Sequence, residues 1–274
     1  MRKSDRGADQ HVALVTGASG GIGAAVSGTL AAAGAAVLVA ARDLERCERV
    51  ARELELAGFR AWPLRLDVTD AESVERAVRE ARRLSAELGP IDWLVNNAGM
   101  AVSAPLLPKR DDLGELHRAH LEVNLHGARR LIETLAPGMK ERGYGRVVNV
   151  ASSAGLRGYA YASAYCASKF ALVGYTLAAA EDLRDSGVTV NAVCPHYVDS
   201  PMLDAAIERL VRKTGRSADE ARDFFRAENP SGELVTPDLV ALAVLGLLGG
   251  EETGALLELD GSSAFRLRTP GERG

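Results

Sequence analysis

A glycine-rich stretch directly follows a short aliphatic run near the start of the chain. The run is His11–Val15, the stretch is Thr16–Gly23, and the small residues of Ile22–Ala33 come next. Glycines between a buried strand and a helix allow a tight turn and a close approach of phosphate to the backbone, while the helix N-terminus offers free N–H groups. No Gly-Lys-Ser/Thr sequence ends the stretch, which disfavours a P-loop nucleotidase. The pattern predicts a dinucleotide site built from Gly17, Ser19, Gly20, Gly21, Ile22 and Gly23.

Strand-like and helix-like segments alternate along the rest of the chain. The further strands that we expect are Val37–Ala41, Phe59–Leu66, Ile91–Val95, Arg146–Val150, Val188–Val193 and Ala255–Leu259. The further helices that we expect are Asp43–Ala57, Asp70–Leu88, Leu113–Leu135, Ser163–Asp185, Pro201–Ala227 and Thr236–Leu248. Aliphatic strands separated by helices predict a parallel sheet covered on both faces. With right-handed crossovers this is a doubly wound α/β fold of the Rossmann type, with about seven strands and its crevice at their carboxyl ends.

One domain is expected over residues 11–261, because no repeat, low-complexity segment or linker rich in Pro, Gly or Ser interrupts this stretch. The polar residues 1–10 are expected to form a flexible N-terminus. Residues 262–274 are expected to be a C-terminal tail, either loose or docked on a neighbouring subunit.

The charge balance and the cysteines narrow the function classes. A net charge of −4, with 33 Lys and Arg residues scattered along the chain, favours neither nucleic acid nor an anionic membrane as a partner. Cys47, Cys166 and Cys194 lie far apart without zinc-ligand spacing, so we expect no metal site. The aliphatic run Leu239–Leu248 is too short to span a bilayer, and Met1–Gln10 lacks the apolar stretch of a signal peptide. These features favour a cytoplasmic protein.

The end of the second expected strand bears on the choice of dinucleotide. Binding the free 2′-hydroxyl of NAD usually needs an acidic residue there, but this strand ends in Ala41-Arg42. Arg42 can pair with a 2′-phosphate through charge-assisted hydrogen bonds, or it can cap a surface turn. We therefore favour NADP(H) over NAD(H). After the third strand, Asp67 and its neighbour Val68 are candidate cofactor contacts; Asp67 either binds the adenine amine or caps the next helix.

Five motifs, in order, resemble those of the classical short-chain dehydrogenase/reductase family, and the resemblance runs from about His11 to Gly261. They are Thr-Gly-xxx-Gly-x-Gly at Thr16–Gly23, Asn96-Asn97-Ala98-Gly99, Asn124, Ser152 with Gly155, and Tyr165-xxx-Lys169. The resemblance implies an NADP(H)-dependent oxidoreductase that moves a hydride between nicotinamide and a carbonyl/alcohol pair. The catalytic residues that it implies are Ser152, Tyr165, Lys169 and Asn124.

The implied catalytic residues form an acid–base unit. Tyrosine has a reference pKa of about 10, and a nearby cation lowers that pKa toward the working pH by favouring the phenolate. Lys169 lies four residues after Tyr165, so both lie on one helix face. By resemblance, Lys169 also bonds the nicotinamide ribose, Ser152 polarises the substrate oxygen, and Asn124 anchors a water of a proton relay. Ser153 can replace Ser152 in principle, but the family spacing favours Ser152.

The resemblance also implies the rest of the site. Besides Tyr165 and Lys169, further cofactor contacts are expected from Asn96, Ala98, Gly99, Pro195, Val198 and Ser200. Residues 196–230 are expected to form a substrate loop or lid, and the candidate substrate residues are His196, Tyr159, Tyr161 and Met202. His196 stands where the family usually has glycine, and it can reshape the pocket, hydrogen-bond the substrate or point outward.

A ketoreductase with Tyr165 as proton donor is the leading hypothesis, because NADPH is normally the reducing pool. One alternative is the oxidation of a secondary alcohol with NADP or NAD. Another is a catalytically silent NADP-sensing protein, which the presence of both Tyr165 and Lys169 disfavours. Candidate substrates include β-ketoacyl thioesters, polyketides, steroids, sugars and small ketones. By resemblance we also expect a homo-oligomer, either a dimer or a tetramer.

Overall fold

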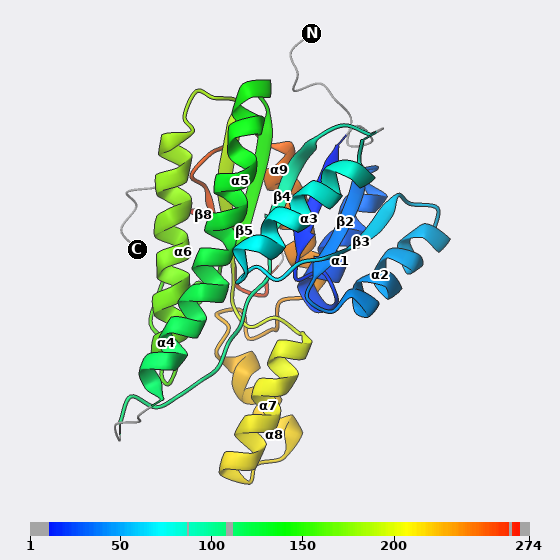
Figure 1. Cartoon of the computed structure of the whole chain (residues 1–274). Helices are drawn as coiled ribbons and strands as arrows, with labels where there is room; N and C mark the ends of the chain where they lie inside the picture. Colours follow the sequence, from blue (N-terminus) through cyan, green and yellow to red (C-terminus); the bar gives the residue numbers. More distant parts are fainter. Residues whose placement is uncertain (1–10, 87, 108–111, 263–264, 269–274) are drawn as a thin grey trace.

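A computed structural model describes residues 11–86, 88–107, 112–262 and 265–268, and it contains one eight-stranded sheet (Figure 1). The strand order is β3-β2-β1-β4-β5-β6-β7-β8. The strands are β1 (Val12–Thr16), β2 (Ala36–Ala41), β3 (Ala61–Arg65), β4 (Ile91–Asn96), β5 (Gly145–Val150), β6 (Val188–Pro195), β7 (Leu256–Leu259) and β8 (Phe265–Arg268). Neighbouring strands are parallel up to β7, and β8 alone in this sheet is antiparallel to its neighbour. The predicted doubly wound α/β fold is confirmed, and the predicted segment 1–10 lies outside the described residues.

Helices cover both faces of the sheet because successive strand residues point to opposite sides. In β1, Ala13 and Val15 belong to one hydrophobic core, while Val12 and Leu14 belong to the other. The first core is closed by α1 (Gly21–Ala32), α2 (Leu44–Leu56) and α9 (Pro237–Gly249). The second is closed by α3 (Ala71–Leu84), α5 (Gly127–Arg142) and α6 (Ser163–Asp182), with α4 (Leu113–Leu121) packed on α6.

The strand order reverses direction at the centre of the sheet. The chain runs outward from β1 through β2 to β3, and then returns to place β4 on the other side of β1. At such a switch point the loops after β1 and β4 diverge, leaving a crevice beyond the carboxyl ends of the strands. The glycine-rich loop follows β1 and the Asn96–Gly99 motif follows β4, so both predicted cofactor motifs meet at this crevice.

The structure corrects one expectation about the elements and refines two. The tail after Gly261 contains β8, because Gly261 has a φ of 97° that lets the chain turn back along β7. The long helix expected at Leu113–Leu135 is interrupted by a π-helical turn, Glu122–His126, and then continues to Arg142. The segment Pro201–Ala227 is helical as expected and is divided into two helices.

The two helices are α7 (Pro201–Thr214) and α8 (Ala218–Ala227). Gly215, with a φ of 72°, ends α7, and the capping box of Ser217 and Glu220 starts α8. Figure 1 shows them standing beyond one end of the sheet, and their small core contains Leu203, Ile207 and Ala221.

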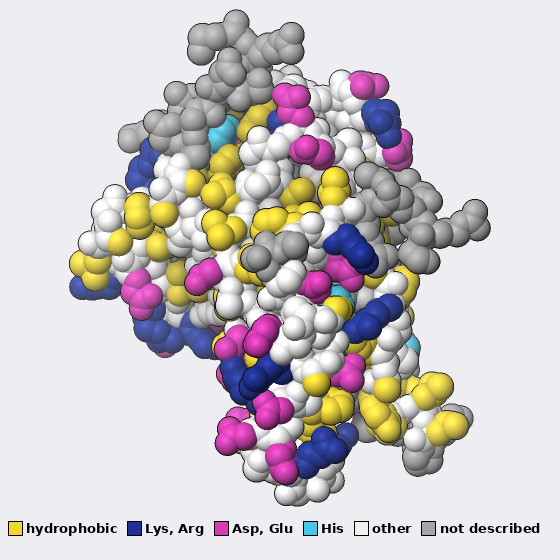
Figure 2. Space-filling model, turned by 180° about the vertical axis from the view of Figure 1, so that it is seen from behind, with side chains coloured by type: hydrophobic (Ala, Val, Ile, Leu, Met, Phe, Trp, Pro, Cys, Tyr) yellow, Lys and Arg dark blue, Asp and Glu magenta, His cyan; other side chains and the backbone are white. Residues whose placement is uncertain are grey.

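The surface of the α7–α8 lobe carries mixed charge. Figure 2 shows acidic and basic side chains interspersed with hydrophobic ones over the lower part of the molecule. Arg222 bridges Asp199 and Asp204, which ties α8 to the start of α7. Within the described residues, no helix combines the length and the apolar character that crossing a membrane requires.

Candidate active site

The glycine-rich loop presents backbone at the start of α1. Gly20 is the N-cap of α1 and no side chain caps the helix, so its first N–H groups face the crevice. A Cβ on Gly17 would lie 2.8 Å from the Ala98 Cα, and a Cβ on Gly23 would lie 2.3 Å from the Gly17 oxygen. Glycine is therefore needed at these positions for the loop to pack against the β4 motif. Gly21 lies against the start of α7, since its Cβ would be 3.3 Å from Pro201 Cδ.

The Asn96–Gly99 motif holds the loop in place. The Thr16 hydroxyl accepts hydrogen bonds from the backbone N–H groups of Asn97 and Ala98, each at 3.0 Å. The Asn97 amide donates to the backbone oxygens of Thr16 at 2.9 Å and Gly17 at 3.1 Å. These bonds give Asn97 and Thr16 a structural role, since both hold the glycine-rich loop against the β4 motif.

A chain of amides crosses the sheet from Asn96. Its Nδ2 donates to Asn149 at 2.8 Å, and Asn149 donates to the Thr176 hydroxyl at 2.9 Å. Asn96 Oδ1 is buried without a hydrogen-bond partner among the described residues. Such an orphaned acceptor at the edge of the crevice fits a bound group that carries a donor, such as a ribose hydroxyl.

Two arginines lie just after β2, near the glycine-rich loop. Arg42 is exposed at the end of β2. The pKa of Asp67 is lowered: burial opposes this shift, but the hydrogen bonds from Thr69 and, to a smaller extent, the positive charge of Arg42 outweigh it. One of the two interpretations of Asp67, that it caps the next helix, is wrong, because Asp70 is the N-cap of α3. Arg46 was not predicted: its Nη2 lies 3.8 Å from the position that a Cβ on Gly20 would take. The sequence could have indicated Arg46 as a site residue, because it lies four residues after Arg42.

Ser152, Tyr165 and Lys169 are brought together beyond β5. The Ser152 hydroxyl follows β5, accepts from the Ala154 N–H at 3.1 Å and hydrogen-bonds Tyr165. Lys169 is 4% exposed, its ammonium donates to the Val150 oxygen at 2.8 Å, and it lies 5.9 Å from the centre of the Tyr165 ring. The structure thus assembles the predicted acid–base unit from one loop and one turn of α6.

The electrostatics differ from the sequence-based expectation in one respect. The pKa of Tyr165 is not lowered toward neutrality; burial raises it to about 12, against the opposing effect of the Ser152 hydrogen bond. Burial also lowers the pKa of Lys169 to about 8. Desolvation disfavours both charged forms and is the main cause of each shift, whereas the Tyr-xxx-Lys spacing suggested that the two groups would support each other's charge. Tyr165 is consequently a phenol that keeps its proton at neutral pH.

Asn124 lies in the π-helical turn between α4 and α5. Its amide donates to the Met100 oxygen at 3.0 Å and the Ser168 hydroxyl at 2.9 Å, and its Oδ1 accepts from the Met100 N–H at 2.8 Å. π-Helical turns often occur at functional sites, and this one aims Asn124 at α6. Gly99 lies beside it, since its Cβ would be 3.3 Å from Asn124 Oδ1 and 3.8 Å from Lys169 Nζ. The side chain therefore anchors the β4 loop to the catalytic helix.

Gly155 sets the distance between the Ser152 loop and α6. A Cβ there would lie 2.7 Å from the Lys169 backbone oxygen and 2.9 Å from Val173 Cγ2. Gly155→Ala is expected to push the loop off α6, to reduce stability by about 1–3 kcal/mol and to lower kcat by separating Ser152 from Tyr165. Urea titration and initial rates measure both effects. Gly158→Ala is the matched control, because nothing lies within 4 Å of its Cβ position; equal behaviour of the two variants would contradict this role for Gly155.

The loop after β6 carries the residues that were expected to flank the nicotinamide. Val198 forms an isolated parallel bridge with Val235. The Ser200 hydroxyl donates to the Val198 oxygen at 3.1 Å and caps α7. Pro195 ends β6, and the next residue, His196, is buried rather than outward-pointing. The outward orientation is therefore wrong: His196 bonds to Glu258 and Tyr159.

The other candidate substrate residues differ in position. The Tyr159 hydroxyl lies 2.8 Å from the Ser153 hydroxyl, and its ring packs edge-on against Tyr197. Tyr161 is 68% exposed with a φ of 61°, and Met202 is 44% exposed on the first turn of α7. Tyr159 thus belongs to the packed wall next to Ser152, while Tyr161 and Met202 lie at the surface. Val68 packs against Gly127 and is buried behind the crevice.

Comparison with known proteins agrees with this geometry. The family model for short chain dehydrogenase matches residues 11–210. The chain belongs to the short-chain dehydrogenase family. It is 36% identical to D-beta-hydroxybutyrate dehydrogenase of Cupriavidus necator, over 91% of this chain and 96% of that protein. It is 38% identical to cis-4-hydroxycyclohexanecarboxylate dehydrogenase of Sinomonas cyclohexanicum, over 92% of this chain and 96% of that protein.

A solved structure extends the comparison. The fold matches a crystal structure of a variant of actinorhodin polyketide ketoreductase with NADPH at a TM-score of 0.84 and 37% identity, covering 93% of this chain and 98% of that one. Membership of the family makes the chain an oxidoreductase that interconverts carbonyl and alcohol groups. The uncapped N-terminus of α1 and the orphaned Asn96 oxygen fit the dinucleotide that this chemistry needs.

Proposed function

We propose that this protein is an NADPH-dependent ketoreductase. The observation that carries the proposal is the cluster of Ser152, Tyr165 and Lys169 at the crevice where the glycine-rich loop and the β4 motif meet. A similar chain, actinorhodin polyketide ketoreductase, has been crystallised with NADPH. The bound dinucleotide would supply the hydride to the carbonyl carbon.

The residues of the chain act on the carbonyl oxygen. Ser152 and Tyr165 donate hydrogen bonds to it, which stabilises the negative charge that develops as the carbon is reduced. Tyr165 then gives its proton to this oxygen, forming the alcohol and leaving a phenolate. The Lys169 ammonium stabilises that phenolate, and a proton from solvent restores the phenol.

We favour reduction over oxidation because NADPH is normally the reducing pool, and the protonated phenol of Tyr165 is consistent with this direction. Its pKa, raised to about 12 by burial, keeps the phenol protonated at neutral pH, which suits a proton donor. Oxidation of an alcohol needs the phenolate as a base, and this form is scarce until the pH is high. Alcohol oxidation is the second candidate function, because two similar proteins are dehydrogenases.

The choice of NADP(H) rests on Arg42, supported by Arg46. Both are exposed at the adenosine end of the crevice, where a 2′-phosphate would lie between β2 and the glycine-rich loop. Arg42→Ala is expected to weaken NADPH binding about 10- to 100-fold, the effect of losing a charge-assisted hydrogen bond, and to leave NADH binding nearly unchanged. Fluorescence titration measures both dissociation constants. Arg49→Ala, also exposed on α2, is the control; equal weakening of NADPH and NADH by Arg42→Ala would refute this role.

The activity is tested with a panel of carbonyl compounds. The panel contains a β-ketoacyl thioester, a bicyclic ketone, a β-keto acid and a small aliphatic ketone, each with NADPH and with NADH. We expect absorbance at 340 nm to fall with at least one ketone, faster with NADPH. No turnover of any ketone, combined with NADP-dependent oxidation of the matching alcohols at neutral pH, would favour the second candidate.

A further inference from the structure

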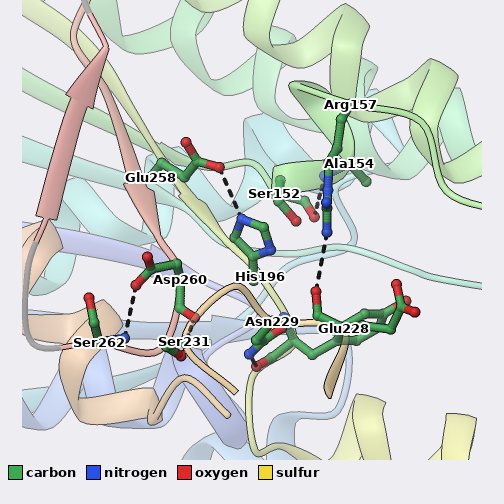
Figure 3. A network of polar contacts seen from close by, with 12 residues as sticks. Ser152, Ala154, Arg157, His196, Glu228, Asn229, Ser231, Glu258, Asp260 and Ser262 are labelled. Carbon is green, nitrogen blue, oxygen red and sulfur yellow. Dashed lines mark hydrogen bonds and ion pairs between the residues drawn. The ribbon is translucent and has the colours of Figure 1, made fainter. Parts of the chain in front are cut away.

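His196 links the last part of the sheet to the Ser152 loop. The side chain is 6% exposed at the end of β6, and each ring nitrogen has a partner. Nε2 lies 3.0 Å from Glu258 Oε1 on β7, and Nδ1 lies 3.3 Å from the Tyr159 hydroxyl. Figure 3 shows the ring between Glu258 and the loop that carries Ser152 and Arg157. A glycine at this position could make neither bond.

The Tyr159 hydroxyl is the junction of this network. Besides His196 Nδ1, it contacts the Ser153 hydroxyl at 2.8 Å and Arg157 Nε at 2.9 Å. Arg157 Nη2 in turn donates to the backbone oxygen of Glu228 at 3.2 Å, which ties the loop to the end of α8. Tyr159 lies close enough to Tyr165 to help raise its pKa, although burial is the main cause. The network therefore borders the hydroxyls that bind the substrate oxygen.

For a neutral His196, hydrogen-bond accounting gives each bond a direction. A carboxylate only accepts, so the bond to Glu258 requires a proton on His196 Nε2. A neutral imidazole then has Nδ1 as an acceptor, and Tyr159 donates to it. The two acceptor positions of the Tyr159 oxygen are filled by Arg157 Nε–H and by the Ser153 hydroxyl. The phenol is fully satisfied, with one bond donated and two accepted.

We propose that His196, supported by Glu258, is a positioning residue that fixes the Tyr159 and Ser153 hydroxyls as a rigid wall beside Ser152. The wall orients the bound ketone before proton transfer, so the proposal rests on the proposed function. Removing the ring leaves the Tyr159 proton without an acceptor and the Glu258 carboxylate without this donor. The wall then loosens, which weakens substrate binding, while Tyr165 and Lys169 keep their own contacts.

The direction of the bonds is tested without turnover. Histidine ¹⁵N resonances of the full-length protein report the tautomer of each ring, and His196→Asn identifies the His196 signals. We expect the Nε2–H tautomer in the wild type, and in Tyr159→Phe a shift of the Nδ1 resonance toward that of an imidazole nitrogen with no hydrogen bond. An Nδ1–H tautomer, or an Nδ1 resonance unmoved by Tyr159→Phe, would overturn the proposal even if no ketone were reduced.

The effect on substrate is tested by a double-mutant cycle of His196→Gly and Tyr159→Phe, with any ketone that the wild type reduces. Each single variant is expected to raise KM about tenfold, as loss of one buried hydrogen-bond partner does, with kcat within about twofold. Because His196 acts through Tyr159, the double variant should be no worse than the poorer single one. His196→Asn, which keeps an acceptor near the Nδ1 position, should recover part of the loss.

The control cycle replaces Tyr159→Phe by Tyr144→Phe. Tyr144 bonds Trp93, whose strand pairs at that point with the start of β5, far along the strand from Ser152. Its effects should add to those of His196→Gly. Additive effects for His196 with Tyr159, in variants whose thermal midpoints show that they are folded, would overturn the proposal. Absence of ketone reduction by the wild type would instead refute the proposed function, and the tautomer measurement would then decide on the network.

Discussion

Tyr165→Phe is expected to lower kcat/KM for carbonyl reduction by about 10²–10⁴-fold, the usual contribution of a positioned general acid. The phenol bonds Ser152, and burial raises its pKa to about 12, so it carries its proton to the reaction at any physiological pH. Phenylalanine fills nearly the same volume on α6 and removes only the hydroxyl. The loss should therefore appear in kcat, while the dissociation constant for NADPH changes little. Initial rates and fluorescence titration separate the two quantities.

Tyr175→Phe is the matched control for this prediction. Tyr175 lies on the same helix, is partly buried, and packs against the second hydrophobic core away from the crevice. Its substitution should leave kcat/KM within about twofold, as expected for removal of a phenol that contacts no reacting atom. If Tyr165→Phe kept full turnover, or lost activity only in proportion to lost NADPH binding, the assignment of Tyr165 as proton donor would fail.

The parts of the fold that could be predicted from the sequence are those governed by local rules. The strand–loop–helix at Thr16–Gly23 needs glycine because Gly17 and Gly23 pack against backbone, and the residue types alone disclose this. The buried strands are rich in aliphatic residues and are separated by helices, so their parallel pairing could be predicted from the sequence, while their order could not. β8 escaped prediction because it has only four residues, and its pairing depends on the turn at Gly261.

The parts of the site that could not be predicted depend on contacts distant in the sequence. The departure at His196 was visible, but its partners Glu258 and Tyr159 lie 62 and 37 residues away. The pKa of Tyr165 was expected to fall because spacing reveals the neighbouring Lys169 but not the burial of the two groups. The π-helical turn at Asn124 likewise depends on Met100 and on α6, which no helical periodicity encodes.

Lys169→Met is expected to lower kcat/KM about 10²-fold and to change its pH dependence. An ammonium 5.9 Å from the Tyr165 ring stabilises the phenolate left after proton transfer by about 3 kcal/mol at an effective dielectric constant of about 20. Burial lowers the pKa of Lys169 to about 8, so this charge is present below that pH and is lost above it. In the wild type, kcat/KM for reduction should be level below pH 8 and fall as the pH rises further. The Met variant should lack this break, whereas Lys140→Met, exposed on α5, should keep it.

The buried ammonium of Lys169 supports catalysis but lowers the stability of the folded protein. Its folded-state pKa of about 8 lies below the value of 10.5 for the free group, so folding disfavours the charged form. At pH 7, Lys169→Met is therefore expected to melt at or above the wild-type temperature, because a buried charge has been removed. Between pH 8 and 10.5 the folded wild type has released this proton while the unfolded chain still holds it. The stability of the wild type therefore rises with pH, and the difference in stability between the Met variant and the wild type becomes smaller. If Lys169 serves catalysis, the Met variant should be much less active than the wild type and no less stable. A variant destabilised at pH 7 would instead make Lys169 a structural residue, held by its bond to Val150.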